Sequence, residues 1–285
     1  MSTFDPPVQV VRDAAARALA EDLGPLGDVT AALVAADARA VADIVVRQDG
    51  VLAGTACATE VFAQLDDAVG VAWLADDAAE LAPGAKVARI EGPLRSVLTG
   101  ERSALNFLCH LSGVATLTRA FVRAAGDTTR IWDTRKTLPG LRALEKAAVR
   151  AGGGVNHRAT LSDFVLVKDN HLGDLTIAQA VERAHARWPG RLVEVECERL
   201  EQVREALAAG AGMVMLDNMS SDQVRECVVA VRAEHRPGVL VEVSGGVTLD
   251  NVAAYAAAGA DLISTSAITQ SAPALDLGLD LHTET

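Results

Sequence analysis

Residues 239–266 read VLVEVSGGVTLDNVAAYAAAGADLISTS and contain the unit from which the fold follows. A short apolar run ends in Ser-Gly-Gly, an alanine-rich helical stretch follows, and a second apolar run ends in Ser-Thr-Ser. A strand joined through a helix to the next strand is a right-handed β-α-β unit, whose two strands lie parallel in one sheet. This stretch therefore predicts an α/β fold.

The same unit recurs towards the N-terminus. Six apolar runs end in polar or charged residues, with patterned helices between most of them: RIWDTRK (130–136), FVLVKDN (164–170), LVEVE (192–196), MVMLDN (213–218), VLVEVSGG (239–246) and DLISTS (261–266). A complete β/α barrel has about eight strands, so these six predict an open, incomplete α/β barrel. A doubly wound sheet has the same pattern, and periodicity alone does not separate the two.

The chain before these runs has a different order of expected helices and strands. Residues 8–22 are amphipathic, and further helices are expected at 55–65 and from Gly100 to about Ala125. Strand-like runs bounded by Gly and Pro lie among them, at 42–54, 71–77 and 85–92. This order predicts an α+β domain before the barrel.

The formal charge of −12 argues against a nucleic-acid partner or an anionic membrane, because either normally requires a basic face. One stretch differs: Arg130 to Lys168 contains eight basic and three acidic residues, a net charge of +5, so the rest of the chain carries −17. A local positive site in an acidic protein suits a small, highly anionic ligand. A solvated basic helix would have the same composition.

The four cysteines are scattered without a C-x-x-C pair, which predicts buried free thiols rather than a zinc or redox motif: Cys57, Cys109, Cys197 and Cys227. The N-terminus has no basic start followed by an apolar run, and no long uncharged apolar stretch occurs. We therefore expect a soluble, cytoplasmic protein.

In a β/α barrel the functional side chains lie where strands end and loops begin. The six predicted strand ends carry cations, carboxylates and small residues: Thr134, Arg135, Lys136, Lys168, Asp169, Asn170, Glu196, Asp217, Asn218, Ser244, Gly245, Gly246, Thr265 and Ser266. Arg and Lys bind carboxylates or phosphates, while Asp and Glu hold Mg²⁺ or ribose hydroxyls. Such a ring predicts a substrate that brings negative groups together with a metal ion.

Lysine is rare in this chain, and two of its four lysines, Lys136 and Lys168, fall at predicted strand ends. Simple pairing of either lysine with a carboxylate is the alternative. The SGG at 244–246 precedes a helical stretch, so its N–H groups are expected to face a phosphate, unless it forms only a turn. The glycines at 152–154 either position the side chains that follow or form a flexible loop.

Several stretches, in this order and spacing, resemble the quinolinate phosphoribosyltransferase family: GERSALNFLCHLSGVATLT (100–118), DTRKTLPGLRALEKAAVRAGGGVNHR (133–158), VKDNH (167–171), VEVE (193–196), MLDN (215–218) and EVSGGVTLDN (242–251). The resemblance covers nearly the whole chain, and DTRKT with GGGVNHR and KDNH is highly specific. It implies an N-terminal α/β sandwich domain, a barrel catalytic domain and a C-terminal segment that returns to the first domain, at 1–112, 113–270 and 271–285. It also implies a homodimer or higher oligomer in which Arg102 reaches the partner's site.

The implied activity joins quinolinate to the ribose of 5-phosphoribosyl 1-pyrophosphate, with loss of CO₂, to give nicotinate mononucleotide for de novo NAD synthesis. The resemblance implies a catalytic set of Lys136, Lys168, Glu196 and Asp217. The substrate contacts that it implies, from the pyridine carboxylates to the 5′-phosphate, are Arg102, Thr134, Arg135, Lys136, His157, Arg158, Lys168, Glu196, Asp217, Ser244, Gly245, Gly246, Ser266 and Ala267. Glu196 and Asp217 would hold Mg²⁺ directly, through water or through substrate.

The chemistry agrees with these residue types. Both substrates are anions, so Arg and Lys are needed to bring them together. A carboxylate stabilises positive charge on the ribose as pyrophosphate leaves, and Mg²⁺ neutralises the leaving group. Glycosylation makes the ring nitrogen positive, which is what loss of CO₂ requires, so no organic cofactor is expected.

The chain departs from the family pattern at the phosphate end. Ser266 stands where the family often has Gly, and Gln270 where many members have His, which puts the Ser266 contact in doubt. His110 and His171 lie inside family motifs, and we expect structural roles for both because no step requires another base.

Three alternatives remain at this point. A related phosphoribosyltransferase could take another aromatic acid, since the residues define the phosphoribosyl half better than the acceptor. A Schiff-base barrel aldolase would use Lys168 as nucleophile. A non-catalytic anion-binding protein would have little use for Glu196 and Asp217.

Overall fold

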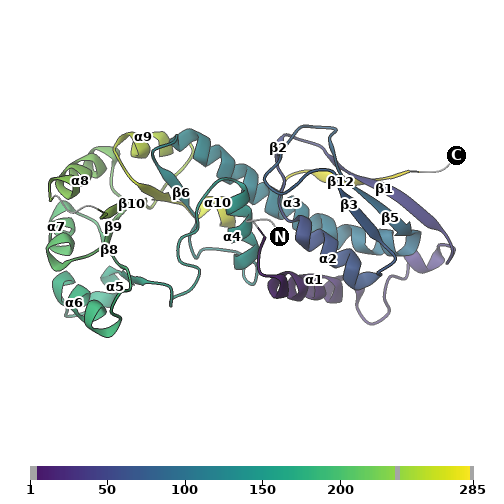
Figure 1. The fold of residues 1–285 in the computed structure, drawn as a ribbon, viewed down its shortest axis with the longest axis horizontal. Helices are drawn as coiled ribbons and strands as arrows, with labels where there is room; N and C mark the ends of the chain where they lie inside the picture. Colours follow the sequence, from purple (N-terminus) through teal and green to yellow (C-terminus); the bar gives the residue numbers. More distant parts are fainter. Residues whose placement is uncertain (1–4, 235–237, 283–285) are drawn as a thin grey trace. The chain divides into compact units, whose positions relative to one another are not determined.

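The computed structural model describes residues 5–234 and 238–282, and within them the chain divides into two compact units. The first unit contains residues up to 119 together with 137–153 and those from 268 onward, and the second contains 120–136 and 154–267. Each unit consists of helices packed on a sheet (Figure 1). In the described part of the chain, no helix has both the length and the apolar character that a membrane span requires.

The first unit is built on a four-stranded antiparallel sheet in the order β12-β1-β5-β3. Its strands are β1 (Arg39–Val46), β3 (Gly70–Trp73), β5 (Lys86–Pro93) and β12 (Leu277–His282), and a small pair is formed by β2 (Gly50–Val51) and β4 (Glu80–Leu81). Its helices are α1 (Val8–Leu23), η1 (Ala31–Leu33), α2 (Thr55–Leu65), most of α3 (Leu94–Ala125), α4 (Arg142–Ala151) and most of the short α10 (Ala267–Gln270).

Alternation along β1 defines the core of this unit. Ala42, Ile44 and Val46 are buried on one face of the strand, where they belong to one apolar cluster with Phe62 of α2 and Leu108 of α3. Because successive side chains of a strand point to opposite faces, the residues between them face away from this cluster.

Helix α3 begins at Leu94, directly after β5, and not at Gly100 as predicted. A glycine inside a helix normally costs stability, but here a Cβ at position 100 would lie 2.6 Å from a ring atom of Phe62. The glycine therefore permits close packing of α3 on α2, a tertiary effect that a local pattern does not reveal.

Within the described residues, the second unit is a six-stranded parallel sheet in the order β6-β11-β10-β9-β8-β7. The strands are β6 (Arg130–Trp132), β7 (Val165–Val167), β8 (Val193–Cys197), β9 (Met213–Asp217), β10 (Leu240–Ser244) and β11 (Leu262–Ser264). The helices are α5 (Asp169–Leu172), α6 (Ile177–Arg187), α7 (Leu200–Ala209), α8 (Ser221–Ala233) and α9 (Val252–Ala257), and α6 to α9 follow the outside of the curved sheet in Figure 1.

This sheet confirms the predicted open α/β barrel of six parallel strands. The first strand, β6, pairs with the last, β11, while the other end of the sheet is β7. The returning chain adds one parallel bridge at the free edge of β6, between Trp132 and Val155. The opening of the barrel therefore lies between this edge and β7.

Strand register brings the polar strand ends to one level. Ser244 lies opposite Asp217, and Glu196 lies opposite Met215. These side chains share the concave face with Glu242, which also lies opposite Met215, because side chains alternate along each strand. The other face carries the apolar residues that pack against the helices.

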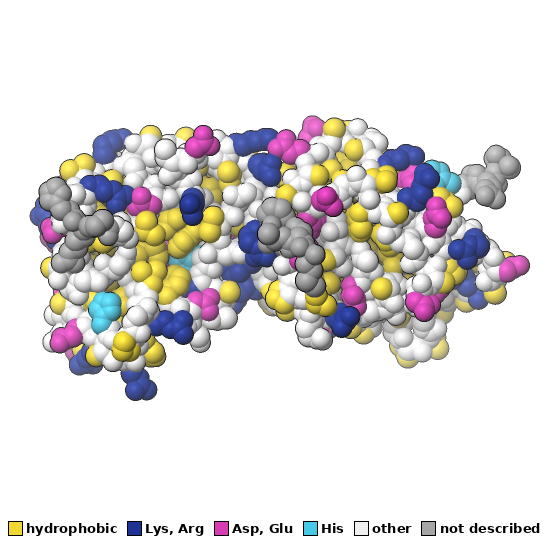
Figure 2. Space-filling view, viewed as in Figure 1, with side chains coloured by type: hydrophobic (Ala, Val, Ile, Leu, Met, Phe, Trp, Pro, Cys, Tyr) yellow, Lys and Arg dark blue, Asp and Glu magenta, His cyan; other side chains and the backbone are white. Residues whose placement is uncertain are grey.

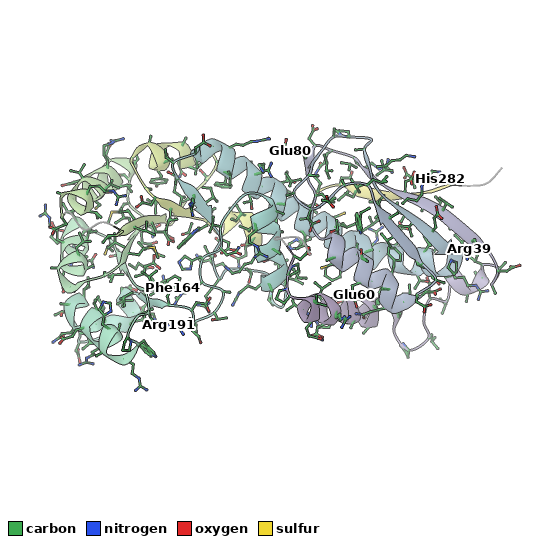
Figure 3. All side chains as sticks on the ribbon, in the orientation of Figure 1. Arg39, Glu60, Glu80, Phe164, Arg191 and His282 are labelled. Carbon is green, nitrogen blue, oxygen red and sulfur yellow. The ribbon has the colours of Figure 1, made fainter. Side chains whose placement is uncertain are left out.

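The sheet of the first unit carries a buried carboxylate on the face away from the apolar cluster. Asp43 of β1 accepts from Arg89 at 3.0 Å on the adjacent β5, and contacts Lys86 at 2.6 Å and His282 at 2.8 Å. His282 lies at the end of β12, as Figure 3 shows. Arg89 and Lys86 hold the pKa of Asp43 well below its usual range, against the opposing effect of burial. One carboxylate thus joins three strands.

We expect Asp43→Asn to lower the free energy of unfolding by about 1–2 kcal/mol at pH 7, because a charged acceptor is lost while its donors remain half exposed. The depressed pKa means that this contribution is present above the unfolded pKa of about 3.9 and is lost as the pH falls further. Urea denaturation at neutral and acidic pH measures both effects. Asp280→Asn, which removes an exposed partner of Arg47, is the control and should change stability little; equal effects of the two substitutions would contradict the prediction.

Candidate active site

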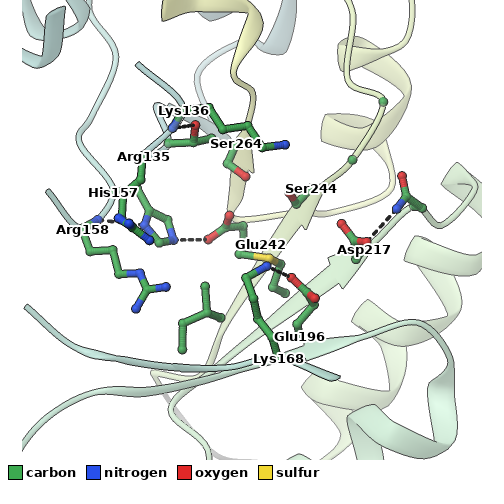
Figure 4. A pocket seen from close by; sticks show the side chains of 16 residues that line it. Arg135, Lys136, His157, Arg158, Lys168, Glu196, Asp217, Glu242, Ser244 and Ser264 are labelled. Atoms are coloured by element: carbon green, nitrogen blue, oxygen red, sulfur yellow. Dashed lines mark hydrogen bonds and ion pairs between the residues drawn. The ribbon is translucent and has the colours of Figure 1, made fainter. Parts of the chain in front are cut away.

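A cavity of about 470 Å³ opens at the carboxyl ends of the parallel strands of the second unit. Its size lies within the usual range for small-molecule sites. The lining side chains come from separate strands and loops and converge on one space (Figure 4): Thr134, Arg135, Lys136, His157, Arg158, Leu166, Lys168, Glu196, Met215, Asp217, Asn218, Glu242, Ser244, Gly245, Gly246 and Ser264.

Most of the predicted site residues line this one cavity. Six do not: Arg102 is exposed on α3 in the first unit, Asp169 and Asn170 begin α5 after β7, and Thr265, Ser266 and Ala267 follow β11 outside the lining.

Two arginines, Arg135 and Arg158, bring positive charge to the cavity. The guanidinium of Arg158 lies 5.8 Å from the centre of the Phe164 ring and donates to the Phe164 carbonyl at 3.4 Å. Burial lowers the pKa of Arg158, and the charge of Arg135 lowers it further. Phe164, which Figure 3 labels, therefore stabilises the guanidinium of Arg158, whereas the charge of Arg135 destabilises it. A bound anion would relieve this repulsion.

Four of the eight basic residues from Arg130 to Lys168 line the cavity. Arg135, Lys136, Arg158 and Lys168 line the cavity, whereas the basic residues of α4, Arg142, Lys146 and Arg150, belong to the first unit. The expectation of a single positive site was therefore only half right. Elsewhere, acidic and basic side chains are scattered over the face shown in Figure 2.

Lys168 and Glu196 form an ion pair inside the cavity. The backbone N–H of Lys168 donates to Nδ1 of His171 at 3.1 Å, which fixes the turn after β7. The sequence left two alternatives for Lys168, which were pairing with a carboxylate or a place in the site. In the structure Lys168 both pairs with Glu196 and lines the cavity.

The loop after β10 brings backbone close to the cavity. Gly245 and Gly246 have φ values of +88° and +61°, which favour glycine, and a Cβ at Gly245 would come within 2.9 Å of the Asn218 backbone nitrogen. Asn218, itself at φ +54°, donates from its N–H to the Ser244 carbonyl at 3.0 Å and from its side chain to Asp217 at 2.6 Å. Consecutive residues of this kind form a concavity suited to an anion.

Two buried glutamates lie under His157. Glu194 of β8 and Glu242 of β10 are fully buried, and each places an oxygen 3.4 Å from Nε2 of His157. Figure 4 shows the contact with Glu242. Burial raises the pKa of Glu194, and the charge of Glu242 raises it further. Two adjacent carboxylates in an apolar interior cannot both stay ionised cheaply, so the pair attracts a proton.

The backbone decides which tautomer His157 adopts. Burial opposes a charged imidazole, but the two carboxylates prevail and raise the pKa of His157. The N–H of Arg158 donates to Nδ1 at 2.8 Å, and a nitrogen that accepts a hydrogen bond carries no proton. This geometry assigns the ring proton of the neutral imidazole to Nε2, and the raised pKa of Glu194 places the additional proton that the cluster attracts on that carboxylate.

Sequence reasoning missed the functional setting of Glu194 and Glu242. A signal was present, because Glu194 precedes Glu196 by two positions and Glu242 precedes Ser244 by two. Residues two apart on a strand face the same side. Both glutamates could thus have been assigned to the interior of the barrel.

Other candidate groups lie outside the cavity. His110 contacts the buried Glu145 at 2.9 Å within the first unit. The four described cysteines are free, with Cys109 partly buried and the others buried. Burial raises the pKa of Cys57 and Cys197 to about 12, so these thiols are poor nucleophiles.

Comparisons with known proteins bear on the whole chain. Residues 28–112 match the family described as "Quinolinate phosphoribosyl transferase, N-terminal domain", and residues 114–280 match its C-terminal domain. The chain belongs to the quinolinate phosphoribosyltransferase family. Every residue that lines the cavity falls within the family's C-terminal domain.

Relatives in this family are similar over nearly their full length. The chain is 42% identical over 278 residues to the nicotinate-nucleotide pyrophosphorylase [carboxylating] of Mycobacterium leprae, covering 95% of this chain and 96% of that protein. The human protein of the same name is 39% identical over 257 residues, covering 88% and 85%. The solved structure of the Francisella tularensis nicotinate-nucleotide pyrophosphorylase is 39% identical, with a TM-score of 0.92 over 99% of both chains.

Proposed function

We propose that this protein transfers the phosphoribosyl group of 5-phosphoribosyl 1-pyrophosphate to quinolinate with loss of CO₂, giving nicotinate mononucleotide and pyrophosphate for de novo NAD synthesis. Relatives that match most of the chain are named carboxylating nicotinate-nucleotide pyrophosphorylases. The observation that carries the proposal is the convergence of four cationic side chains and several carboxylates on one cavity. Such a site suits two polyanionic substrates.

Quinolinate binds against the cationic side of the cavity. Arg135 and Arg158, whose mutual repulsion an anion relieves, bind its carboxylates as planar donors. His157, Thr134, Lys136 and Lys168 line the same cavity. In this proposal the two lysines contact both substrates. Binding both anions in one cavity places the ring nitrogen near C1 of the ribose.

The 5′-phosphate of the sugar binds at the loop of Ser244, Gly245 and Gly246, which has the positive φ values and close backbone approach that such a cradle requires. The Ser266 and Ala267 backbone belongs to the same proposed subsite. Both residues directly follow β11, next to Ser264 in the cavity wall.

In the transfer step the ring nitrogen forms a bond to C1 while the bond from C1 to pyrophosphate breaks. Positive charge develops on the sugar, and Glu196 and Asp217 are placed to stabilise it electrostatically. The bond from C2 to its carboxylate then breaks, and its electron pair stays on C2, next to the positive ring nitrogen. A proton taken up at C2 completes nicotinate mononucleotide.

Mg²⁺ fits the carboxylate side of the cavity. Glu196 and Asp217 are oxygen donors from adjacent strands on one wall, and Mg²⁺ is usually held by one or two carboxylates together with substrate phosphates. When bound, the ion would neutralise the departing pyrophosphate. No organic cofactor is needed for this chemistry.

The Schiff-base alternative is disfavoured by a specific contact. A lysine must lose its proton to act as a nucleophile, and Lys168 is an ammonium group paired with Glu196. A related phosphoribosyltransferase with another aromatic acid is the remaining alternative, and the assay below separates it.

We further propose a homodimer in the cytoplasm, in which Arg102 serves the partner's cavity. Arg102 is exposed in the first unit and does not line the cavity of its own chain. Free cysteines are usual for a reducing compartment.

The reaction is tested by incubating purified protein with carboxyl-labelled quinolinate, 5-phosphoribosyl 1-pyrophosphate and Mg²⁺. We expect nicotinate mononucleotide and labelled CO₂ in equal amounts. Product from nicotinate, with none from quinolinate, would reject the acceptor.

Single substitutions separate the two substrate halves. Arg135→Ala and Arg158→Ala should each raise the KM for quinolinate on the order of 10- to 100-fold, because each removes a charged donor from an anion. Asp217→Asn should mainly lower kcat, because its carboxylate acts on charge that develops during transfer. Arg225→Ala and Asp222→Asn, which open an exposed pair on α8, are the matched controls. Unchanged turnover in all three cavity variants would reject the site.

The shared site is tested by complementation. Arg102→Ala and Asp217→Asn should each be nearly inactive as purified variants. A mixture that is unfolded and refolded together should recover about a quarter of the wild-type activity, because half of the dimers are mixed and each of those has one intact site. A mixture no more active than its components would contradict the shared site.

A further inference from the structure

Glu194 and Glu242, which face His157, have no part in the steps above. Both carboxylates are fully buried in the barrel, and in the described structure none of their four oxygens has a hydrogen-bond partner, although one oxygen of each lies 3.4 Å from Nε2 of His157. Burying two carboxylates with so little compensation costs stability. An apolar pair would pack there at lower cost, so stability alone does not account for these residues.

His157 is held on every side of its ring. Nδ1 accepts from the Arg158 N–H at 2.8 Å, and the His157 N–H donates to Asp133 at 2.9 Å. The ring meets Trp132 edge-on at 4.9 Å and Phe164 at 5.1 Å between centroids. The two carboxylates lie at the remaining corner, at Nε2.

This arrangement opposes a flip of the imidazole. A half-turn about the Cβ–Cγ bond would place a carbon where Nδ1 accepts from Arg158 and a second carbon where Nε2 faces the carboxylates. Both contacts would be lost together. Two acceptors converging on Nε2 therefore fix the plane of the ring as well as its tautomer.

A divalent cation is the competing occupant. One donor atom from each of the three side chains lies within 4.8 Å of the others, which is close enough for a metal ion. A metal would need the lone pair of Nε2, so the ring proton would have to move to Nδ1. The Arg158 N–H already occupies that position, and the geometry favours a proton over a metal.

We propose that Glu194 and Glu242 are positioning residues of the quinolinate subsite. By accepting from the Nε2–H of His157 they fix the ring, and through Nδ1 the ring fixes the backbone of Arg158 and the direction in which its guanidinium enters the cavity. The inference rests on the proposed function. It assigns the two glutamates a role in binding quinolinate and none in binding the phosphoribosyl donor.

The kinetic test uses Ala and Gln at both positions. Glu194→Ala and Glu242→Ala should each raise the KM for quinolinate by about tenfold, the factor expected for loss of one ordering hydrogen bond, and leave the KM for 5-phosphoribosyl 1-pyrophosphate within about twofold. Glu→Gln at either position keeps a side-chain carbonyl that accepts from Nε2–H, so it should restore most of the quinolinate affinity. Equal changes in both KM values, or none, would overturn the proposal.

A loss of stability does not mimic this result. Asp43→Asn removes a buried carboxylate from the first unit and is the control, with both KM values expected to stay near wild type. Metal analysis of the purified protein is the second control. One equivalent of divalent cation that disappears in Glu242→Gln would overturn the proposal in favour of a metal site.

A spectroscopic test is independent of turnover. Protein labelled with ¹⁵N-histidine, with the His157 signals assigned from His157→Gln, should show a protonated Nε2 and an unprotonated Nδ1. Glu242→Gln should retain this tautomer, and Glu242→Ala should not. A protonated Nδ1 in the wild-type protein would overturn the inference even if the Ala variants fail to fold. A wild-type protein that makes no nicotinate mononucleotide but has this tautomer would reject the proposed function and leave the His157 geometry standing.

Discussion

One topological constraint determines the site: parallel strands joined by helices end at the same edge of their sheet. Residues as far apart in sequence as Arg135 and Ser244 therefore line one cavity. The alternation of side chains then sorts them, so that Glu196 and Glu242 face the interior while Val195 and Val243 pack against the helices. A shift of one residue in any strand would exchange the two sets.

The cavity combines positive charge in its lining with negative charge in and beside it. Arg158 is desolvated and repelled by Arg135, which prepares the cavity for an anion. Glu194 and Glu242 partly offset that repulsion, since both favour the charged guanidinium of Arg158. A cavity lined by cations alone would be destabilised when empty. The buried carboxylates therefore permit a strongly cationic site in an acidic protein.

Features set by local sequence could be predicted, and features set by distant packing could not. All six strands of the barrel were predicted because each is a short apolar run that ends at a polar residue. The start of α3 was missed because the place of Gly100 inside a helix depends on Phe62 of another helix. The basic stretch was read as one site because closeness in sequence was taken for closeness in space, yet α4 belongs to the other unit. Glu194 was missed because a carboxylate in a buried strand has no local signature apart from its spacing to Glu196.

The path of the chain between β6 and β7 explains why the barrel is open and why the acceptor site lies where it does. After Arg135 and Lys136 the chain leaves the second unit, forms α4 in the first, and returns at Gly154. On its return it does not form a full strand but makes one bridge to Trp132 at the free edge of β6. That bridge places His157 within reach of Asp133, whose carboxylate accepts from the His157 N–H at 2.9 Å and from Asn156 at 2.6 Å. A closed barrel would have filled this edge with the next strand. Because the edge is left free, the two basic segments that flank the excursion both reach the cavity, although the seventeen residues 137–153 lie between them in sequence.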